Sequence, residues 1–316
     1  MTAIPAMARE VLTRGVLCYL AAPSPRGPHV TPVVFVLDGD RLWGSTGRGT
    51  TKAARWREDP VAGGLIRAGR HAVTFRGAVT LYDALDPSTW LDSLARGPQV
   101  ARASARFTIK NARFFAGYTR DVAKVPLAWT PPARVLFSVD LQAVAVLDGD
   151  SVLERWGSWA RSVAGHRSYR RVAAAVRRSR LPAGVRDLVG RTGRGTLGLE
   201  SRHGPVVLPA RWTRSADVFL AVIPRRTLSL AGAADDRPGS LVIDHASSWR
   251  ASKMRGILLR GDAAVFDPDE VVQGHRALAE DLGAIDEMPD DSAVVRLRPR
   301  SAVWWVGWSS GTVSPR

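Results

Sequence analysis

The sequence has 316 residues, of which 45% are apolar, and its formal net charge is +16 at pH 7. A chain of this length and apolar content buries the cores of two ordinary domains, so the composition excludes a disordered or fibrous protein. No stretch of about 18 apolar residues is present, and Arg9 and Glu10 precede the first apolar segment. We therefore expect a cytoplasmic protein without a membrane partner.

The first part of the chain predicts a meander of short strands. Apolar, β-branched segments separated by turn residues are typical of antiparallel strands, and Asp38-Gly39 is a strong hairpin signal. Strands are predicted over residues 16–22, 29–39, 40–46, 60–66 and 71–83, with a short helix over 51–59.

Two longer segments have helical patterns. Residues 88–123 predict one or two helices, inserted before a strand over 134–149. Residues 158–189 predict a helical connector with an apolar stripe at helical spacing and a basic face beside it. The basic face is either a surface for nucleic acid or an acidic partner, or a solvated face of the connector, which we favour. The stripe consists of Tyr169, Val172, Ala173 and Val176, and the basic face of Arg170, Arg171, Arg177 and Arg178.

Three short signatures recur in the same order in both halves of the chain, which indicates a duplicated domain. Further strands over 206–212, 217–224, 239–246 and 254–267 repeat the theme of the first half, so the sequence predicts an antiparallel barrel or sandwich, twice. The signature pairs are Arg14–Leu17 with Arg194–Leu197, Gly27–Pro32 with Gly204–Pro209, and Arg76–Asp83 with Arg260–Asp267.

The motif order of the first half resembles the flavin-binding split β-barrels of the pyridoxamine 5'-phosphate oxidase-like superfamily. The matching features are a strand beginning near Gly27-Pro28, the hairpin, a strand ending in Ser45-Thr46, the Thr51-Lys52 turn and Asp59-Pro60. The resemblance covers about residues 9–85, and the second half only through the repeat and residues 296–311.

This resemblance implies a mainly β protein with helical insertions (α+β), built from two tandem split β-barrels. Such barrels usually form homodimers with the cofactor in the groove between them, so one duplicated chain would form a pseudo-dimer. We expect a monomer of this kind, or a weak homodimer. The predicted domains are residues 1–157 with the helical insertion at about 88–123, a helical connector over 158–190, and residues 191–316.

The segment Ser45–Pro60 is the candidate phosphate site. A glycine-rich turn before a helix offers backbone N–H groups, and hydroxyl and basic side chains add donors and charge. The resemblance implies that these groups hold the phosphate of flavin mononucleotide (FMN). Alternatively, Thr50 or Thr51 only caps the helix and Lys52 is solvated. The expected phosphate ligands are Thr46, Thr51 and Lys52, with Ser45 and Thr50 beside them and with Arg48, Arg55 or Arg57 as reinforcement.

The second half lacks the Thr-Thr-Lys turn and has Asp235 and Asp236 nearby, so we expect one full site per chain. The second barrel would then provide the opposite wall. Trp304 and Trp305 point to opposite faces of a strand, so at most one of them faces the cofactor. The wall candidates are Trp249, Arg250, Lys253, Arg300, Trp304 and Trp305.

These features favour a flavin- or deazaflavin-dependent oxidoreductase that transfers hydride to or from an unidentified small molecule. The cofactor is FMN or the 8-hydroxy-5-deazaflavin coenzyme, and no catalytic side chain is assigned. The main alternative is a non-catalytic protein that binds the cofactor, and a nucleic-acid binder is a weaker one. The sequence shows no serine hydrolase motif and no metal-ligand spacing.

Overall fold

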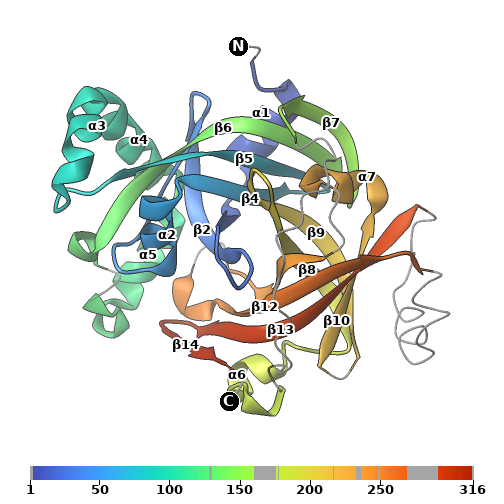
Figure 1. Ribbon diagram of the computed structural model, residues 1–316. Helices are drawn as coiled ribbons and strands as arrows, with labels where there is room; N and C mark the ends of the chain where they lie inside the picture. The colour runs from blue at the N-terminus through green and yellow to red at the C-terminus, as the bar shows by residue number, and fades with distance from the viewer. Residues whose placement is uncertain are drawn as a thin grey trace.

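The computed structural model describes residues 3–127, 130–159, 176, 178–215, 217–232, 236–247, 250–268 and 291–314. Within these residues the chain forms two seven-stranded antiparallel sheets, one in each half (Figure 1). Several residues singled out above lie outside this part of the chain: Tyr169, Arg170, Arg171, Val172, Ala173, Arg177, Asp235 and Trp249.

The first sheet closes into a barrel. Its strand order is β3-β2-β1-β4-β5-β6-β7, and β3 also pairs with β6, so the strands from β1 to β6 form a closed cylinder. Phe35, Phe75 and Phe137 fill its interior, each at most 1% exposed. The strands are β1 (Leu17–Ala22), β2 (His29–Asp38), β3 (Arg41–Gly47), β4 (Val61–Ala68), β5 (His71–Tyr82), β6 (Arg134–Asp148) and β7 (Ser151–Gly157).

The second sheet repeats this topology strand for strand. Its order is β10-β9-β8-β11-β12-β13-β14, and β10 closes the barrel by pairing with β13. The prediction of two tandem split β-barrels is therefore confirmed. The strands are β8 (Thr192–Ser201), β9 (Gly204–Ser215), β10 (Val218–Pro224), β11 (Asp236–His245), β12 (Arg255–Phe266), β13 (Ser292–Val306) and β14 (Ser309–Val313).

The repeated Arg-Gly signature marks the same bulge in both barrels. The pairing with the following strand shifts register between Arg76 and Gly77, and again between Arg260 and Gly261. A Cβ atom on Gly77 would lie 2.2 Å from the carbonyl oxygen of Asp140, and one on Gly261 would lie 2.0 Å from that of Arg298. Only glycine fits at these two positions, which explains why the signature recurs.

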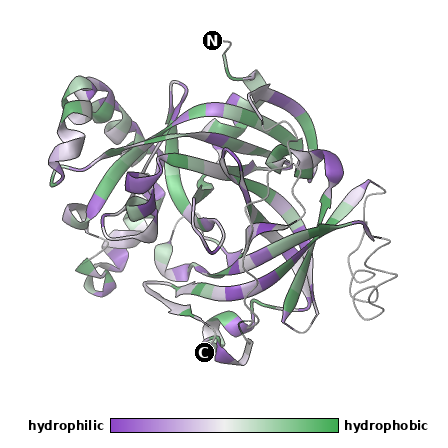
Figure 2. Ribbon diagram, viewed as in Figure 1, coloured by the Kyte–Doolittle hydropathy of each residue, from purple (hydrophilic) through white to green (hydrophobic). Residues whose placement is uncertain are grey.

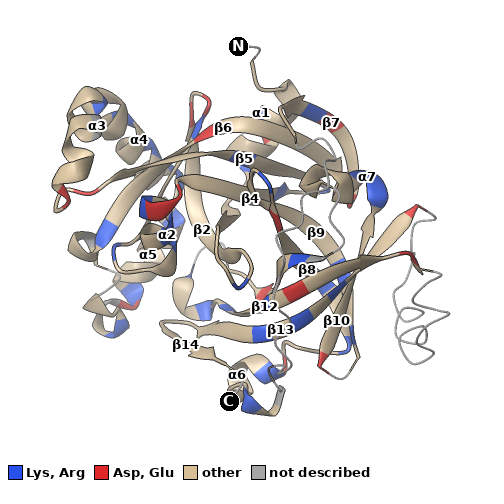
Figure 3. Ribbon diagram, viewed as in Figure 1, with Lys and Arg blue, Asp and Glu red and all other residues tan. Residues whose placement is uncertain are grey.

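The Gly-Pro turns of the repeat lie where the two barrels meet. Gly27 and Gly204 have positive φ angles of 108° and 97°, which favour glycine. A Cβ atom on Gly27 would lie 2.2 Å from the carbonyl oxygen of Gly239, so the turn of the first barrel touches β11 of the second. One continuous apolar cluster includes Leu65 of the first barrel and Leu199 of the second. Apolar segments occur along the strands of both barrels (Figure 2), and basic residues lie on β12 and β13 of the second (Figure 3).

The helical insertion lies outside the first barrel, beside β2 and β3 (Figure 1). It forms three α-helices where one or two were expected, because Gly97-Pro98 and Asn111 interrupt the pattern. Phe107 and Phe114 bury against Trp43. The insertion consists of η1 (Pro87–Thr89), α3 (Trp90–Ala95), α4 (Gly97–Lys110), α5 (Ala112–Arg120) and η2 (Val122–Lys124).

The short helix predicted over 51–59 forms as α2 (Thr51–Glu58) and covers the first barrel through Ala53 and Trp56. Strand β7 was not predicted, because most of its side chains are exposed and its pattern is polar. Among the described helices, none is long and apolar enough to cross a membrane. The other elements are α1 (Ala6–Arg14), η4 (Pro131–Ala133), η5 (Arg178–Arg180), α6 (Ala183–Arg186), α7 (Arg225–Leu228), η6 (Ser229–Ala231) and η7 (Ala251–Lys253).

Candidate functional site

The turn between β3 and α2 brings the predicted hydroxyl groups together. The Oγ1 atom of Thr50 accepts a hydrogen bond from the backbone N–H of Ala53 at 3.4 Å, so Thr50 is the N-cap of α2. The hydroxyl of buried Thr46 lies 3.1 Å from that of Thr50. Thr51, the first residue of the helix, is exposed. The capping role considered for Thr50 is therefore present in the structure.

Lys52 is buried, with an exposed fraction of only 3%. Its Nζ donates a hydrogen bond to the backbone carbonyl of Thr31 at 3.2 Å. Burial lowers the pKa of Lys52 to about 7, and the nearby charge of Arg134 contributes to this shift. The alternative of a solvated Lys52 is therefore wrong, because this side chain lies against the barrel rather than in water.

Two further basic side chains belong to this region, His29 beside Lys52 and Arg260 beside His29, and neither was predicted as part of the site. His29 follows the Gly-Pro turn of the first barrel, and Arg260 lies on β12 of the second. Burial lowers the pKa of His29 to about 3, with the charges of Lys52 and Arg260 acting in the same direction. Burial, followed by the charges of Arg26 and Arg55, lowers the pKa of Arg260. We call Arg26, Lys52, Arg55 and Arg260, together with the neutral imidazole of His29, the first cationic cluster.

Buried donors of this cluster lack partners within the described residues. The Nδ1 atom of His29 and the Nε atom of Arg260 have no hydrogen-bond partner there, and neither does the hydroxyl of Ser240, which lies opposite Arg260 on β11. His29 is 9% exposed and Arg260 is 7% exposed. Buried polar groups normally have partners, so this set indicates a place for a ligand that accepts hydrogen bonds.

The charge of the cluster is also uncompensated in the part of the chain that the structure describes. No carboxylate there contacts Lys52 or Arg260, whereas Arg55 pairs with Glu58 at 2.5 Å. Burying like charges without a counterion is unfavourable, and an entering anion removes that penalty. The cluster is therefore suited to bind an anion. A sequence signal for Arg260 existed, because it belongs to the repeated Arg-Gly signature.

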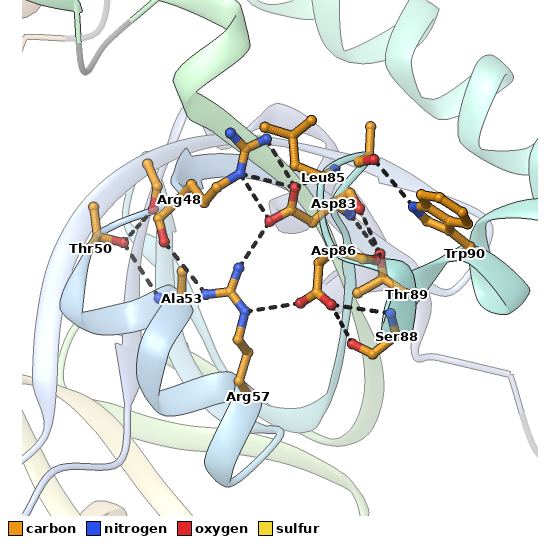
Figure 4. A network of polar contacts seen from close by, with 12 residues as sticks. Arg48, Thr50, Ala53, Arg57, Asp83, Leu85, Asp86, Ser88, Thr89 and Trp90 are labelled. Atoms are coloured by element: carbon orange, nitrogen blue, oxygen red, sulfur yellow. Dashed lines mark hydrogen bonds and ion pairs between the residues drawn. The ribbon is translucent and has the colours of Figure 1, made fainter.

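Arg57 has carboxylate partners instead (Figure 4). Its guanidinium contacts Asp83 at 2.9 Å and Asp86 at 3.4 Å, and Arg48 also holds Asp83, with an ion-pair distance of 2.9 Å. Asp83 is 1% exposed. Burial opposes its ionisation, but hydrogen bonds from Arg48 and from the Leu85 N–H outweigh burial and lower its pKa. Arg48 and Arg57 thus fasten the β3–α2 turn to the end of β5.

Ser45 connects the turn to β6. Its hydroxyl accepts a hydrogen bond from Nε of Arg134 at 3.1 Å, and its carbonyl accepts one from Nη2 at 2.8 Å. The charge of Arg134 also lowers the pKa of Lys52 and acts on Tyr118 of α5. Arg134 therefore lies between the cationic cluster and the aromatic side chains of the helical insertion.

An aromatic cluster joins the helical insertion to the second barrel. Tyr118 contacts Trp308 edge to face, with ring centroids 4.9 Å apart. Trp305 and Met254 pack in the same cluster with Val34 of the first barrel. Trp304 and Trp305 both pack on the large shared core, and only Trp305 also belongs to the aromatic cluster.

The remaining wall candidates have varied surroundings. Arg250 forms an ion pair with Asp121 at 2.8 Å, and the hydroxyl of Ser252 donates to the same carboxylate at 2.5 Å. Lys253 is exposed. Arg300 forms an ion pair with Asp262. Of the wall candidates that the structure describes, Trp305 is thus the one with the aromatic surroundings expected of a cofactor wall.

Comparison with known proteins gives matches of structure but not of sequence. No family model matches the sequence, and no curated protein matches it. Solved structures match about half of the chain, at low identity. An FAD-binding protein from Mesorhizobium loti is 17% identical with a TM-score of 0.34, and covers 45% of this chain and 94% of that one.

Two other matches have similar values. An F420 reductase is 17% identical with a TM-score of 0.31, and covers 45% of this chain and 98% of that one. General Stress Protein 26 from Bacillus anthracis is 11% identical with a TM-score of 0.31, and covers 46% of this chain and 94% of that one. At these scores the fold assignment rests on the strand pairing of the chain itself.

Proposed function

We propose that this protein binds FMN or the 8-hydroxy-5-deazaflavin coenzyme between its two barrels and transfers hydride to or from a small molecule. The observation that carries the proposal is the first cationic cluster, in which the buried Lys52 and Arg260 have no carboxylate partner among the described residues. The resemblance of Ser45–Pro60 to the phosphate-binding segment of split-barrel flavoproteins points to the same place.

The donor set suits a phosphate. Lys52 and Arg260 would supply charge from the two barrels, and backbone N–H groups at the N-terminus of α2 would supply further donors. The hydroxyl of Thr50 already donates to the carbonyl of Gly47 at 2.8 Å, so the Thr46 hydroxyl beside it would be the one to turn towards the phosphate. A phosphate there would restore the ordinary pKa of Lys52, because its negative charge favours the ammonium form. Arg57 and Arg250 would keep the scaffold in place rather than contact the cofactor.

The aromatic cluster suits a flat ring system. Trp305 and Tyr118 come from different halves of the chain, and Arg134 lies between this cluster and Lys52. Aromatic side chains pack favourably on an extended ring. The cofactor would supply the hydride chemistry, while these side chains would orient the ring and exclude water. In this proposal one chain forms the complete site as a pseudo-dimer.

Cofactor binding tests the proposal directly. Purified protein is titrated with FMN and, separately, with the deazaflavin coenzyme, following ligand fluorescence and the melting temperature. We expect one equivalent of one of them to bind and to raise the melting temperature. The Lys52→Ala variant should bind at least about tenfold more weakly, because a charge-assisted hydrogen bond is worth roughly 1.5–3 kcal/mol.

Lys124→Ala is the matched control, because Lys124 is an exposed lysine outside the cluster. It should bind as the parent does. A protein that binds neither cofactor, or a Lys52→Ala variant with parental affinity, would overturn the proposal. If the cofactor binds but is not reduced or oxidised in turnover with candidate small molecules, the non-catalytic alternative is supported instead.

A further inference from the structure

A pocket of about 520 Å³ opens between the two barrels and is lined by residues from both halves of the chain. The first barrel contributes β4, β5 and β6, and the second contributes the Gly-Pro turn between β8 and β9. Its volume lies in the range of small-molecule sites. It is lined by Asp59, Val61, Arg76, Gln142, Ser158, Arg202, His203 and Gly204.

The centre of this pocket is a buried arginine. Arg76 is 7% exposed, and its guanidinium donates to the backbone carbonyls of His203, at 3.0 Å, and of Ser158. It also lies over the ring of Trp159 at 5.6 Å. Within the described residues its Nε has no hydrogen-bond partner and no carboxylate contacts it. Burial alone lowers its pKa.

The repeat relates this pocket to the first cationic cluster. Arg76 and Arg260 occupy the same position in the two barrels, each at the bulge before the signature glycine. His203 and Arg26 occupy the same position before the two Gly-Pro turns. The pocket thus repeats the basic frame of the first cluster with a different set of neighbours.

The pocket differs from the first cationic cluster because the repeat has no buried lysine at the position of Lys52. Thr227 is the first buried residue of α7, as Lys52 is of α2, and its hydroxyl already donates to the carbonyl of Asp150 at 2.6 Å. Its side chain carries no charge to hold a phosphate together with Arg76. A second copy of the predicted cofactor site is therefore not expected here.

We propose that this pocket binds the oxyanion group, phosphate or carboxylate, of a small polar molecule. Arg76 and Arg202 give the lining a positive charge that Asp59 only partly offsets, while Gln142 and Ser158 add polar groups. Arginine is well suited to hold planar or tetrahedral oxyanions. This inference does not depend on the proposed cofactor function, because it rests on a different set of residues.

The test uses inorganic phosphate in one arm and acetate in the other, with sodium chloride keeping the ionic strength constant. The protein carries Lys52→Ala, so that the first cationic cluster does not contribute the binding, and the melting temperature is measured against anion concentration. We expect saturable stabilisation by at least one anion beyond that of chloride. The arm that saturates at lower concentration shows which oxyanion the pocket prefers.

Arg202→Gln and His203→Gln, added separately, are the informative variants, because both side chains are exposed and their loss should not affect folding. Arg202→Gln should weaken anion binding about tenfold. Arg194→Gln, an exposed arginine of β8 that does not line the pocket, should leave it unchanged. Stabilisation no greater than that of chloride, or equal binding by Arg202→Gln and the parent, would overturn the inference.

Discussion

The two barrels place a buried arginine at the same position and surround it differently. The Nε atom of each lacks a hydrogen-bond partner among the described residues. Arg76 of the first barrel donates to two backbone carbonyls and lines an open pocket, whereas Arg260 of the second lies near the buried His29. The bulge and the Gly-Pro turns are shared. The two copies thus share the same frame, and we propose that the charge at the connection after the third strand distinguishes what each copy binds.

Replacing each arginine in turn tests this difference most directly. Arg76→Met leaves the carbonyls of His203 and Ser158 without their donor, so the free energy of unfolding should fall by about 3 kcal/mol. Arg260→Met removes a buried charge that has no carboxylate partner among the described residues, so stability should stay the same or increase. Urea denaturation of both variants measures the difference.

Cofactor affinity should respond in the opposite order. Arg260→Met should weaken binding about tenfold to a hundredfold, because it removes a charge-assisted donor from the proposed phosphate site. Arg76→Met, measured at a temperature where it is folded, should bind nearly as the parent does. Equal losses of affinity in the two variants would show that the two arginines do not differ in role.

Lys52 offers a second test, through pH. Its pKa is about 7 in the folded chain and 10.5 ordinarily, so between these values the unfolded chain binds more protons. Stability should therefore increase as pH increases from about 7 to 10.5. Lys52→Met, whose unbranched side chain fits the same space, should reduce this increase and raise stability at pH 7. The part that remains comes from Lys110, whose pKa burial lowers to about 8. The measurement is urea denaturation across this pH range.

In the proposed cofactor site the charge of Lys52 strengthens binding, although the same charge lowers the stability of the empty protein. A phosphate selects the ammonium form, so affinity should fall as pH increases above about 7 in the parent. In Lys52→Met the affinity should be lower at pH 7 and depend less on pH. A variant that is less stable at pH 7, or that keeps the parental pH dependence of affinity, would contradict this account of Lys52.

A smaller effect is expected where the helical insertion meets the second barrel. Hydrogen bonds from Arg250 and Ser252 lower the pKa of Asp121 to about 2, so the contact is present above the ordinary carboxylate pKa and is lost as pH falls towards 2. Asp121→Asn should loosen the insertion and speed cofactor release several-fold in stopped-flow experiments. Asp40→Asn, at an exposed position, serves as the control. Unchanged release in both variants would show that the contact of Asp121 does not affect cofactor binding.

The repeat could be recognised in the sequence because it depends on positions where only glycine suits the backbone. Gly27 and Gly204 need positive φ angles, and Gly77 and Gly261 leave no room for a Cβ atom, so these residues recur whatever surrounds them. Most strands of both barrels follow from short apolar segments, although β8 and β14 were not predicted as separate strands. Strand β7 was missed because an edge strand with mostly exposed side chains has no apolar pattern.

Only the residues that the first barrel contributes to the candidate site could be predicted from the sequence. Lys52 and Thr46 lie within one short segment, whereas Arg260 is distant in sequence and approaches His29 only when the barrels pack. The wall candidates were chosen as basic or aromatic residues, and nothing in the sequence indicated that Arg250 is held by Asp121. Partner choice among many arginines depends on tertiary packing, which local patterns do not contain.

The smallest predicted effect concerns the helix cap that distinguishes the two connections. Thr50 caps α2, whereas Pro224 before α7 makes no side-chain cap. Thr50→Ala should lower the free energy of unfolding by about 1 kcal/mol, and the exposed Thr51→Ala should change it by less than about 0.5 kcal/mol. Because Thr50 also contacts Thr46, its loss should weaken cofactor binding several-fold more than the loss of Thr51. Equal affinities for the two variants would show that the hydroxyl of Thr50 serves the helix alone, and the charge of Lys52 would then have to distinguish the two connections by itself.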